Sequence, residues 1–135
     1  MYFDTPELEI FGVYDRGIPN KERIVLRANL DTNLSTYCLV LGFTGGNPNI
    51  IFPVSDHFLW LGNIIAAQNS WIFIFTGPGT PAVTQEINTK FPVQNIFWNK
   101  RNVVLDNQDL TPALLKIQDV LIAGNNKNVN DLIQK

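Results

Sequence analysis

Short runs of alternating apolar and polar residues, each ended by turn-forming residues, constrain the fold of this 135-residue chain more than any other feature. Successive side chains of a strand point to opposite faces, so a run with period two has one core face and one solvent face. Residues 22–30 show this pattern most clearly, with Arg23 and Arg27 on the polar side. The apolar side holds Ile24, Leu26, Ala28 and Leu30. These residues predict an antiparallel strand with one solvated face.

Further runs predict a series of about seven to nine short strands at the spacing typical of sandwiches and barrels. Residues 8–14 are expected to form a hairpin with residues 22–30, because residues 15–20 between them are rich in turn formers. Residues 34–43 are apolar on both faces, which indicates a central strand covered on both sides. Residues 64–67 fit either a helical turn or a strand. The other predicted strands are residues 50–54, 57–62, 71–76, 83–91, 94–98 and 102–105.

One helix is predicted near the C-terminus, over residues 112–123. Thr111 can cap it, Pro112 suits its first position, and Gly124 can end it. Its apolar stripe consists of Leu114, Ile117 and Leu121. The predicted fold is therefore all-β, an antiparallel β-sandwich or small β-barrel closed by one C-terminal α-helix. Residues 1–135 are expected to form a single domain with its core in about 8–124, and 125–135 a tail or short terminal helix.

Composition excludes several classes of function. Charged residues make up 16% of the chain and the net charge is -2, so the long-range attraction to nucleic acid is missing and no nucleic-acid partner is predicted. The longest apolar stretches are interrupted by polar residues, so no membrane association is predicted. A start without an export signal and the single Cys38 fit a cytoplasmic protein. Cys38 is expected to be buried and unreactive, because it lies within the central strand.

The residues that could carry chemistry are few. One His and one Cys cannot form a structural zinc site, and the glycines lack the spacing of a phosphate-binding loop, so neither a metal nor a cofactor is predicted. Asp56 and His57 could assist a serine nucleophile such as Ser35, Ser55 or Ser70. However, neighbours on a strand point to opposite faces. A hydrolase that uses His57 is therefore the third hypothesis, and the sequence favours a protein that is not an enzyme.

Aromatic residues are the more promising feature, since the chain has three Trp and nine Phe. Trp71, Phe73 and Phe75 share one face of a predicted strand, which is typical of a core face and also of an interface. The candidate ligand or interface residues are Trp60, Trp71, Phe73, Phe75, Trp98, Arg23 and Arg27. We predict a noncatalytic interaction or assembly module that binds itself as a homo-oligomer or a protein partner. The alternative is a small-ligand-binding β domain with an aromatic cleft.

Overall fold

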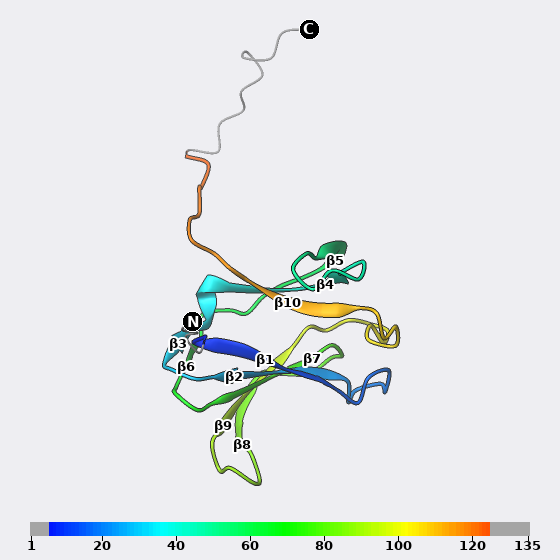
Figure 1. Cartoon of the computed structure of the whole chain (residues 1–135). Helices are drawn as coiled ribbons and strands as arrows, with labels where there is room; N and C mark the ends of the chain where they lie inside the picture. Colours follow the sequence, from blue (N-terminus) through cyan, green and yellow to red (C-terminus); the bar gives the residue numbers. More distant parts are fainter. Residues whose placement is uncertain (1–5, 125–135) are drawn as a thin grey trace, which may run out of the picture.

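A computed structural model describes residues 6–124, and these residues form layers of β-strands (Figure 1). The described residues contain one short 3-10 turn, Leu34–Thr36, and strands that mostly match the predicted ones. The strands are β1 (Leu8–Tyr14), β2 (Arg23–Ala28), β3 (Thr32–Asn33), β4 (Tyr37–Phe43), β5 (Phe52–Trp60), β6 (Ile65–Ala66), β7 (Trp71–Phe75), β8 (Ala82–Gln85), β9 (Pro92–Phe97) and β10 (Thr111–Lys116). The tail or short helix expected at 125–135 lies outside the described residues.

The strands form three separate sheets. A five-stranded sheet has the order β1-β2-β7-β9-β8, a three-stranded sheet has the order β10-β4-β5, and β3 pairs with β6. All pairs are antiparallel except β7 with β9. Figure 1 shows the two larger sheets as two layers. The all-β prediction and the β1–β2 hairpin are confirmed, and residues 6–124 do not form the single closed sheet that a small barrel requires.

The core lies between the two layers and receives the side chains that the period of two assigns to it. Ile24 and Leu26 of β2 are fully buried against Leu39 and Leu41 of β4 in one apolar cluster. The prediction for residues 22–30 is therefore confirmed in its main part, and residues 34–43 contain β4, the central strand of the three-stranded sheet, whose outer side is only partly covered. Leu30 is an exception, with 54% of its surface exposed, because β2 ends at Ala28.

The predicted C-terminal helix is wrong. Thr111–Lys116 instead forms β10, which pairs antiparallel with β4 so that Leu114 lies opposite Leu39. Strand β10 is at the edge of its sheet, where a proline such as Pro112 is tolerated. Burial of Leu114 on the core outweighs the weak local preference for a helix. Leu121, expected in the core, is 98% exposed.

Other strand boundaries also differ from prediction. Residues 50–62 contain one continuous strand, β5, rather than two, and residues 64–67 contain the short strand β6. The strand expected at 83–91 ends at Gln85, and Lys90 takes a positive φ of 66° in the turn that follows. Residues 102–105 form no strand, because the backbone N–H of Leu105 donates to the Glu22 carboxylate and its carbonyl accepts from Arg16.

Glu22 is a buried carboxylate, 1% exposed, that joins three segments of the chain. It accepts hydrogen bonds from the backbone N–H of Gly17 (3.1 Å), Val104 (2.8 Å) and Leu105 (3.1 Å). The hydroxyl of Thr76, just after β7, donates to the same carboxylate. Each buried polar group in this cluster therefore has a partner, as stability requires.

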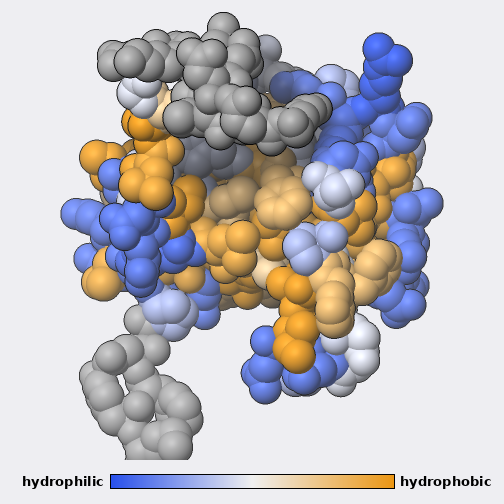
Figure 2. Space-filling view, turned by 90° about the horizontal axis from the view of Figure 1, so that it is seen from above, coloured by the Kyte–Doolittle hydropathy of each residue, from blue (hydrophilic) through white to orange (hydrophobic). Residues whose placement is uncertain are grey.

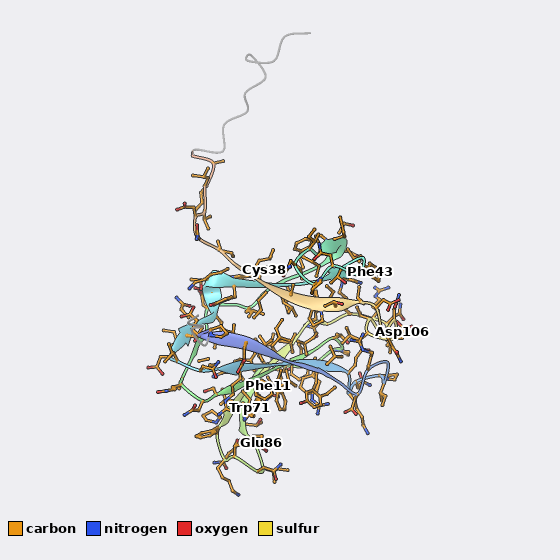
Figure 3. All side chains as sticks on the ribbon, viewed as in Figure 1. Phe11, Cys38, Phe43, Trp71, Glu86 and Asp106 are labelled. Atoms are coloured by element: carbon orange, nitrogen blue, oxygen red, sulfur yellow. The ribbon has the colours of Figure 1, made fainter. Side chains whose placement is uncertain are left out.

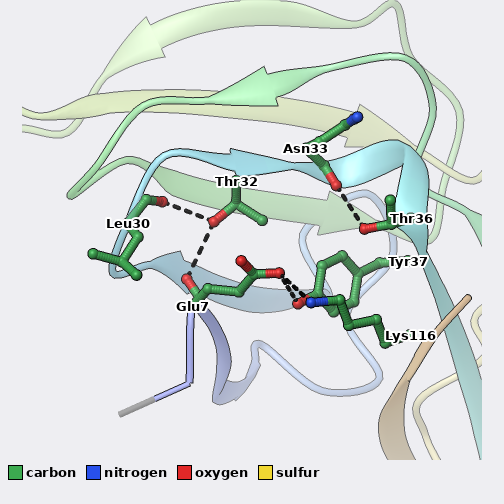
Figure 4. A network of polar contacts seen from close by, with 7 residues as sticks. All are labelled: Glu7, Leu30, Thr32, Asn33, Thr36, Tyr37 and Lys116. Carbon is green, nitrogen blue, oxygen red and sulfur yellow. Dashed lines mark hydrogen bonds and ion pairs between the residues drawn. The ribbon is translucent and has the colours of Figure 1, made fainter. Parts of the chain in front are cut away.

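A second polar cluster connects the start of β1 with the three-stranded sheet (Figure 4). The hydroxyl of Tyr37 donates to Glu7 Oε1 at 2.5 Å, and Lys116 Nζ donates to the same oxygen at 2.9 Å. Thr32 Oγ1 donates to the carbonyls of Glu7 (3.3 Å) and Leu30 (2.7 Å). One carboxylate thus links β1 to both β4 and β10.

We expect this cluster to make stability depend on pH at both ends of the range. Burial, followed by the hydrogen bond to Glu7 and its charge, raises the pKa of Tyr37 above its ordinary value of 10.0. The hydrogen bonds from Tyr37 and Lys116 hold the pKa of Glu7 below 4.5. The stabilisation that the Tyr37 hydrogen bond gives to the folded state is therefore complete below pH 10.0. It declines above that pH, because the tyrosine ionises in the unfolded state before it does so in the folded state. The stabilisation that ionised Glu7 gives to the folded state is present above pH 4.5 and is lost as pH falls below this value.

The measurement is urea unfolding of the wild-type chain and of Tyr37→Phe across pH. The wild type is expected to be more stable near neutral pH, and the difference should shrink above about pH 10 and below about pH 4. Tyr14→Phe is the control, since Tyr14 is 45% exposed. A difference between wild type and Tyr37→Phe that stays constant across this range would contradict the prediction.

Candidate functional site

The outer face of the five-stranded sheet carries alternating arginine and aromatic side chains. Arg27 lies opposite Trp71, Val25 opposite Phe73, and Arg23 opposite Phe75 in the pairing of β2 with β7. The core side of β7 is formed by Ile72 and Ile74, both fully buried. Trp71, Phe73 and Phe75 therefore do not form a core face. Figure 3 shows Trp71 and Phe11 on the side of the sheet that faces away from Cys38 and Phe43.

Both arginines lie over aromatic rings of this face. Arg27 Cζ is 4.4 Å from the ring centroid of Trp71 and 5.4 Å from that of Phe91. Arg23 Cζ is 5.5 Å from Phe73, and it also approaches the rings of Tyr14 and Phe75. Such contacts hold a guanidinium group in a fixed plane and leave its outer edge free to donate hydrogen bonds. The face therefore combines aromatic rings with two arginines, and carboxylates lie near both: Glu9 is opposite Arg27 in the sheet, and Asp15 is paired with Arg23.

The two arginines differ in their partners. Arg23 forms an ion pair with Asp15 at 2.8 Å. Arg27, by contrast, makes neither an ion pair nor a hydrogen bond within residues 6–124. The Nε atoms of both arginines are buried and lack a hydrogen-bond partner. Because these Nε atoms are buried, a ligand can reach only the terminal nitrogens of the two guanidinium groups.

A groove of about 610 Å³ lies over this face. One wall is the surface of β2 and β7, and the other is β8 with the turn that follows it. Trp71 Nε1 donates to Thr89 Oγ1 at 3.1 Å, which fastens this turn beside the aromatic face. Hydrogen bonds from the backbone N–H of Asn88 and Thr89 shape the turn and hold the pKa of Glu86 below 4.5. The groove is lined by Tyr14, Arg23, Val25, Trp71, Phe73, Thr84, Gln85, Glu86, Ile87, Asn88 and Val93.

The structure brings together five predicted residues, Arg23, Arg27, Trp71, Phe73 and Phe75, and separates two. Trp60 lies on β5 in the other sheet, where its Nε1 donates to the carbonyl of Ser35 at 2.8 Å. Trp98 packs against the core, and Lys100 Nζ is 5.1 Å from its ring centroid.

Sequence reasoning missed several residues of this face. Phe11 meets the Trp71 ring edge-on at a centroid distance of 4.9 Å, and Tyr14 lies opposite Arg23. Strict alternation from Leu8 would place Tyr14 on the core side with Ile10, and only the register shift between Ile10 and Gly12 brings it opposite Arg23, so the pattern of residues 8–14 does not reveal it. Phe91 and Thr89 lie in a turn, which has no periodic signal to reveal them.

The surroundings of His57 do not support a hydrolase. Its Nδ1 atom is 3.2 Å from Lys100 Nζ and 3.6 Å from Asp56 Oδ1, and Lys100 also donates to the Asp56 carbonyl at 2.6 Å. No serine or carboxylate in residues 6–124 is hydrogen-bonded to His57, as a catalytic base would require. The same residues contain no cluster of His, Cys, Asp and Glu that could hold a metal ion.

Comparisons of the chain with family models, with curated proteins and with solved structures gave no match. Within the described part of the chain, no helix is long and apolar enough to cross a membrane. Since no known protein indicates a function, we infer one from the groove on the outer face of the five-stranded sheet.

Proposed function

We propose that this chain is a noncatalytic interaction module whose groove binds an extended, acidic segment of a partner protein. The observation that carries the proposal is Arg27, which is stacked on Trp71 and has no anionic partner in the described residues. Arg27 does not itself line the groove but lies over Trp71, which does, so a carboxylate beside the groove would receive charge-assisted hydrogen bonds from this guanidinium group. An aromatic or large aliphatic side chain of the same segment would lie on the rings of Trp71 and Phe73.

Strand β8 favours an extended segment over a compact ligand. It lies at the edge of its sheet beside the groove, and all four of its residues are exposed. An edge strand offers unpaired backbone groups to a peptide, and alternate peptide side chains then enter the neighbouring groove. The alternative is a small ligand in an aromatic cleft, and the groove volume of about 610 Å³ suits such ligands as well.

The test is selection of a displayed library of random peptides on the wild-type chain. We expect enrichment of peptides with Asp or Glu near an aromatic residue. The binding of a selected peptide should weaken at least ~10-fold in Arg27→Ala. Arg27→Lys should recover little of this affinity, because lysine cannot stack or donate in a bidentate way. Peptide binding is measured by fluorescence anisotropy of a labelled peptide.

Trp60→Ala is the matched control, because Trp60 is an exposed tryptophan on the other sheet. It should leave peptide affinity unchanged. Failure to select any acidic motif, or equal affinity of Arg27→Ala and wild type, would refute the peptide proposal. Saturable binding of small aromatic carboxylates without any peptide binding would favour the cleft for small ligands.

Other expectations from the sequence complete this proposal. The two facing layers support assignment of the module to the β-sandwich class. Residues 1–135 as a single domain, a location in the cytoplasm, and the lack of a cofactor or a nucleic-acid partner stay predictions.

A further inference from the structure

The outer face of the three-stranded sheet is apolar and lies on the opposite side of the molecule from the groove. Two rows of side chains cross it in the register of the sheet: Leu115, Cys38 and Trp60, and then Ala113, Val40 and Phe58. We call these six residues the β4 face. Figure 2 looks onto this side of the molecule and shows apolar side chains across it. Trp60 is 52% exposed, Phe58 45% and Leu115 43%, whereas Val40 is fully buried between its neighbours.

The β4 face contains no charged side chain, so two copies can meet on it without repulsion between like charges. A twofold contact places the same surface of both copies together, which suits a face that is uncharged throughout. An acidic or basic partner would find no complementary group in these two rows. The charge pattern therefore favours a second copy of the chain as the occupant.

Next to the β4 face lies a mainly apolar segment, which we call the arm (residues 117–123) and in which Asp119 is the one charged residue. It follows β10, and Figure 1 shows it running away from both layers. Val120 is 69%, Leu121 98% and Ile122 86% exposed. The start of the arm is fixed, because the Ile117 N–H donates to the carbonyl of Thr36 at 2.7 Å. The arm has no glycine or proline to turn it back onto its own β4 face.

We propose that two copies of this chain associate through their β4 faces, with the arm of each copy covering apolar surface of the other. The exposed fractions of the β4 face and the arm correspond to roughly 700 Å² of apolar side-chain surface per copy, if the aliphatic side chains are taken at the lower end of the ~150–250 Å² that aromatic side chains bury. A standard stable interface buries ~800 Å² per partner. The β4 face with the arm thus has enough area for a dimer.

Sedimentation velocity of the full chain over a range of concentrations tests this proposal. The wild type should change from monomer to dimer as concentration rises. Leu121→Asp and Phe58→Asp should each raise the dissociation constant at least ~10-fold. Leu121 is almost fully exposed, so its replacement leaves the fold of the monomer intact. Ile87→Asp is the control, because Ile87 is 83% exposed and lines the groove.

Cys38 provides a second measurement, since it lies in the middle of the β4 face. It is partly buried, which falls short of the predicted full burial, and this burial raises the pKa of its thiol. The rate of labelling by a thiol reagent should fall as the dimer forms, and Leu121→Asp should abolish this concentration dependence.

Three results would overturn the proposal. A wild type that stays monomeric at high concentration excludes the second copy. A dimer that both Leu121→Asp and Phe58→Asp leave unchanged places the contact elsewhere. The third result is a monomeric wild type whose Cys38 is labelled more slowly than that of Leu121→Asp at every concentration. This result would mean that the arm covers the β4 face of its own copy. None of these results bears on peptide binding in the groove, because Arg27 and the β4 face lie on different sheets.

Discussion

Glu22→Ala is expected to lower the free energy of unfolding by about 4 kcal/mol. The carboxylate is buried and accepts from the backbone N–H of Gly17, Val104 and Leu105 and from the hydroxyl of Thr76. Removal of this acceptor leaves several donors without partners, and each buried one costs about 1–3 kcal/mol. Water that enters the cavity compensates only part of that cost.

Urea unfolding of the wild type and the variant measures this loss. Glu22→Gln should be intermediate, because the amide keeps one acceptor oxygen and replaces the other with a donor. Glu9→Ala is the control, since Glu9 lies on β1 and is only partly buried. A loss below about 1 kcal/mol for Glu22→Ala would show that the three segments are held by apolar packing alone.

Gly42→Ala is expected to cost about 3 kcal/mol, at the upper end of the range for an overpacked site. Gly42 lies where the register of β4 and β5 shifts. A Cβ atom at this position would be 2.4 Å from the carbonyl oxygen of Phe52 and 2.8 Å from the Cα atom of Pro53. Both contacts are with the backbone, so no side chain can rotate away, and β5 itself has to move.

Thermal and urea unfolding of Gly42→Ala test this expectation, with Gly124→Ala as the control because a Cβ at Gly124 meets no atom within 4 Å. The control should change stability by less than about 0.5 kcal/mol. If Gly42→Ala is as stable as the wild type, then β5 is not held tightly against β4 at this point.

Local patterns predicted the strands that have one apolar and one polar face. Residues 22–30 are an example, because arginines on one side leave only one possible core side. The C-terminal segment is different, since Leu114 is an apolar position both in a helical stripe and in an edge strand. The choice depends on β4, which is about 70 residues away in sequence and needs a partner for its backbone. No local signal contains that information.

The candidate site was predicted in its residues but not in its arrangement. Strand β7 is apolar on both sides, so its sequence alone does not say whether Trp71 or Ile72 faces the core. Pairing with β2 decides this, because Arg27 lies opposite Trp71 and cannot enter the core. The turn that forms the second wall of the groove was predicted as strand, since Val83 and Ile87 have the character of strand residues.

Strands β8 and β9 are joined to the rest of the five-stranded sheet through β7 alone, and this affects how the groove responds to a ligand. Strands β8 and β9 form a local hairpin, and β7 is the only strand of the five-stranded sheet that pairs with this hairpin. The two walls of the groove thus belong to units that are joined along one seam, the β7–β9 pairing. A ligand that touches both walls binds only while the hairpin is docked, so its binding energy adds to the energy of docking. Ligand binding and the protection of the β8–β9 amides against hydrogen exchange are therefore thermodynamically linked.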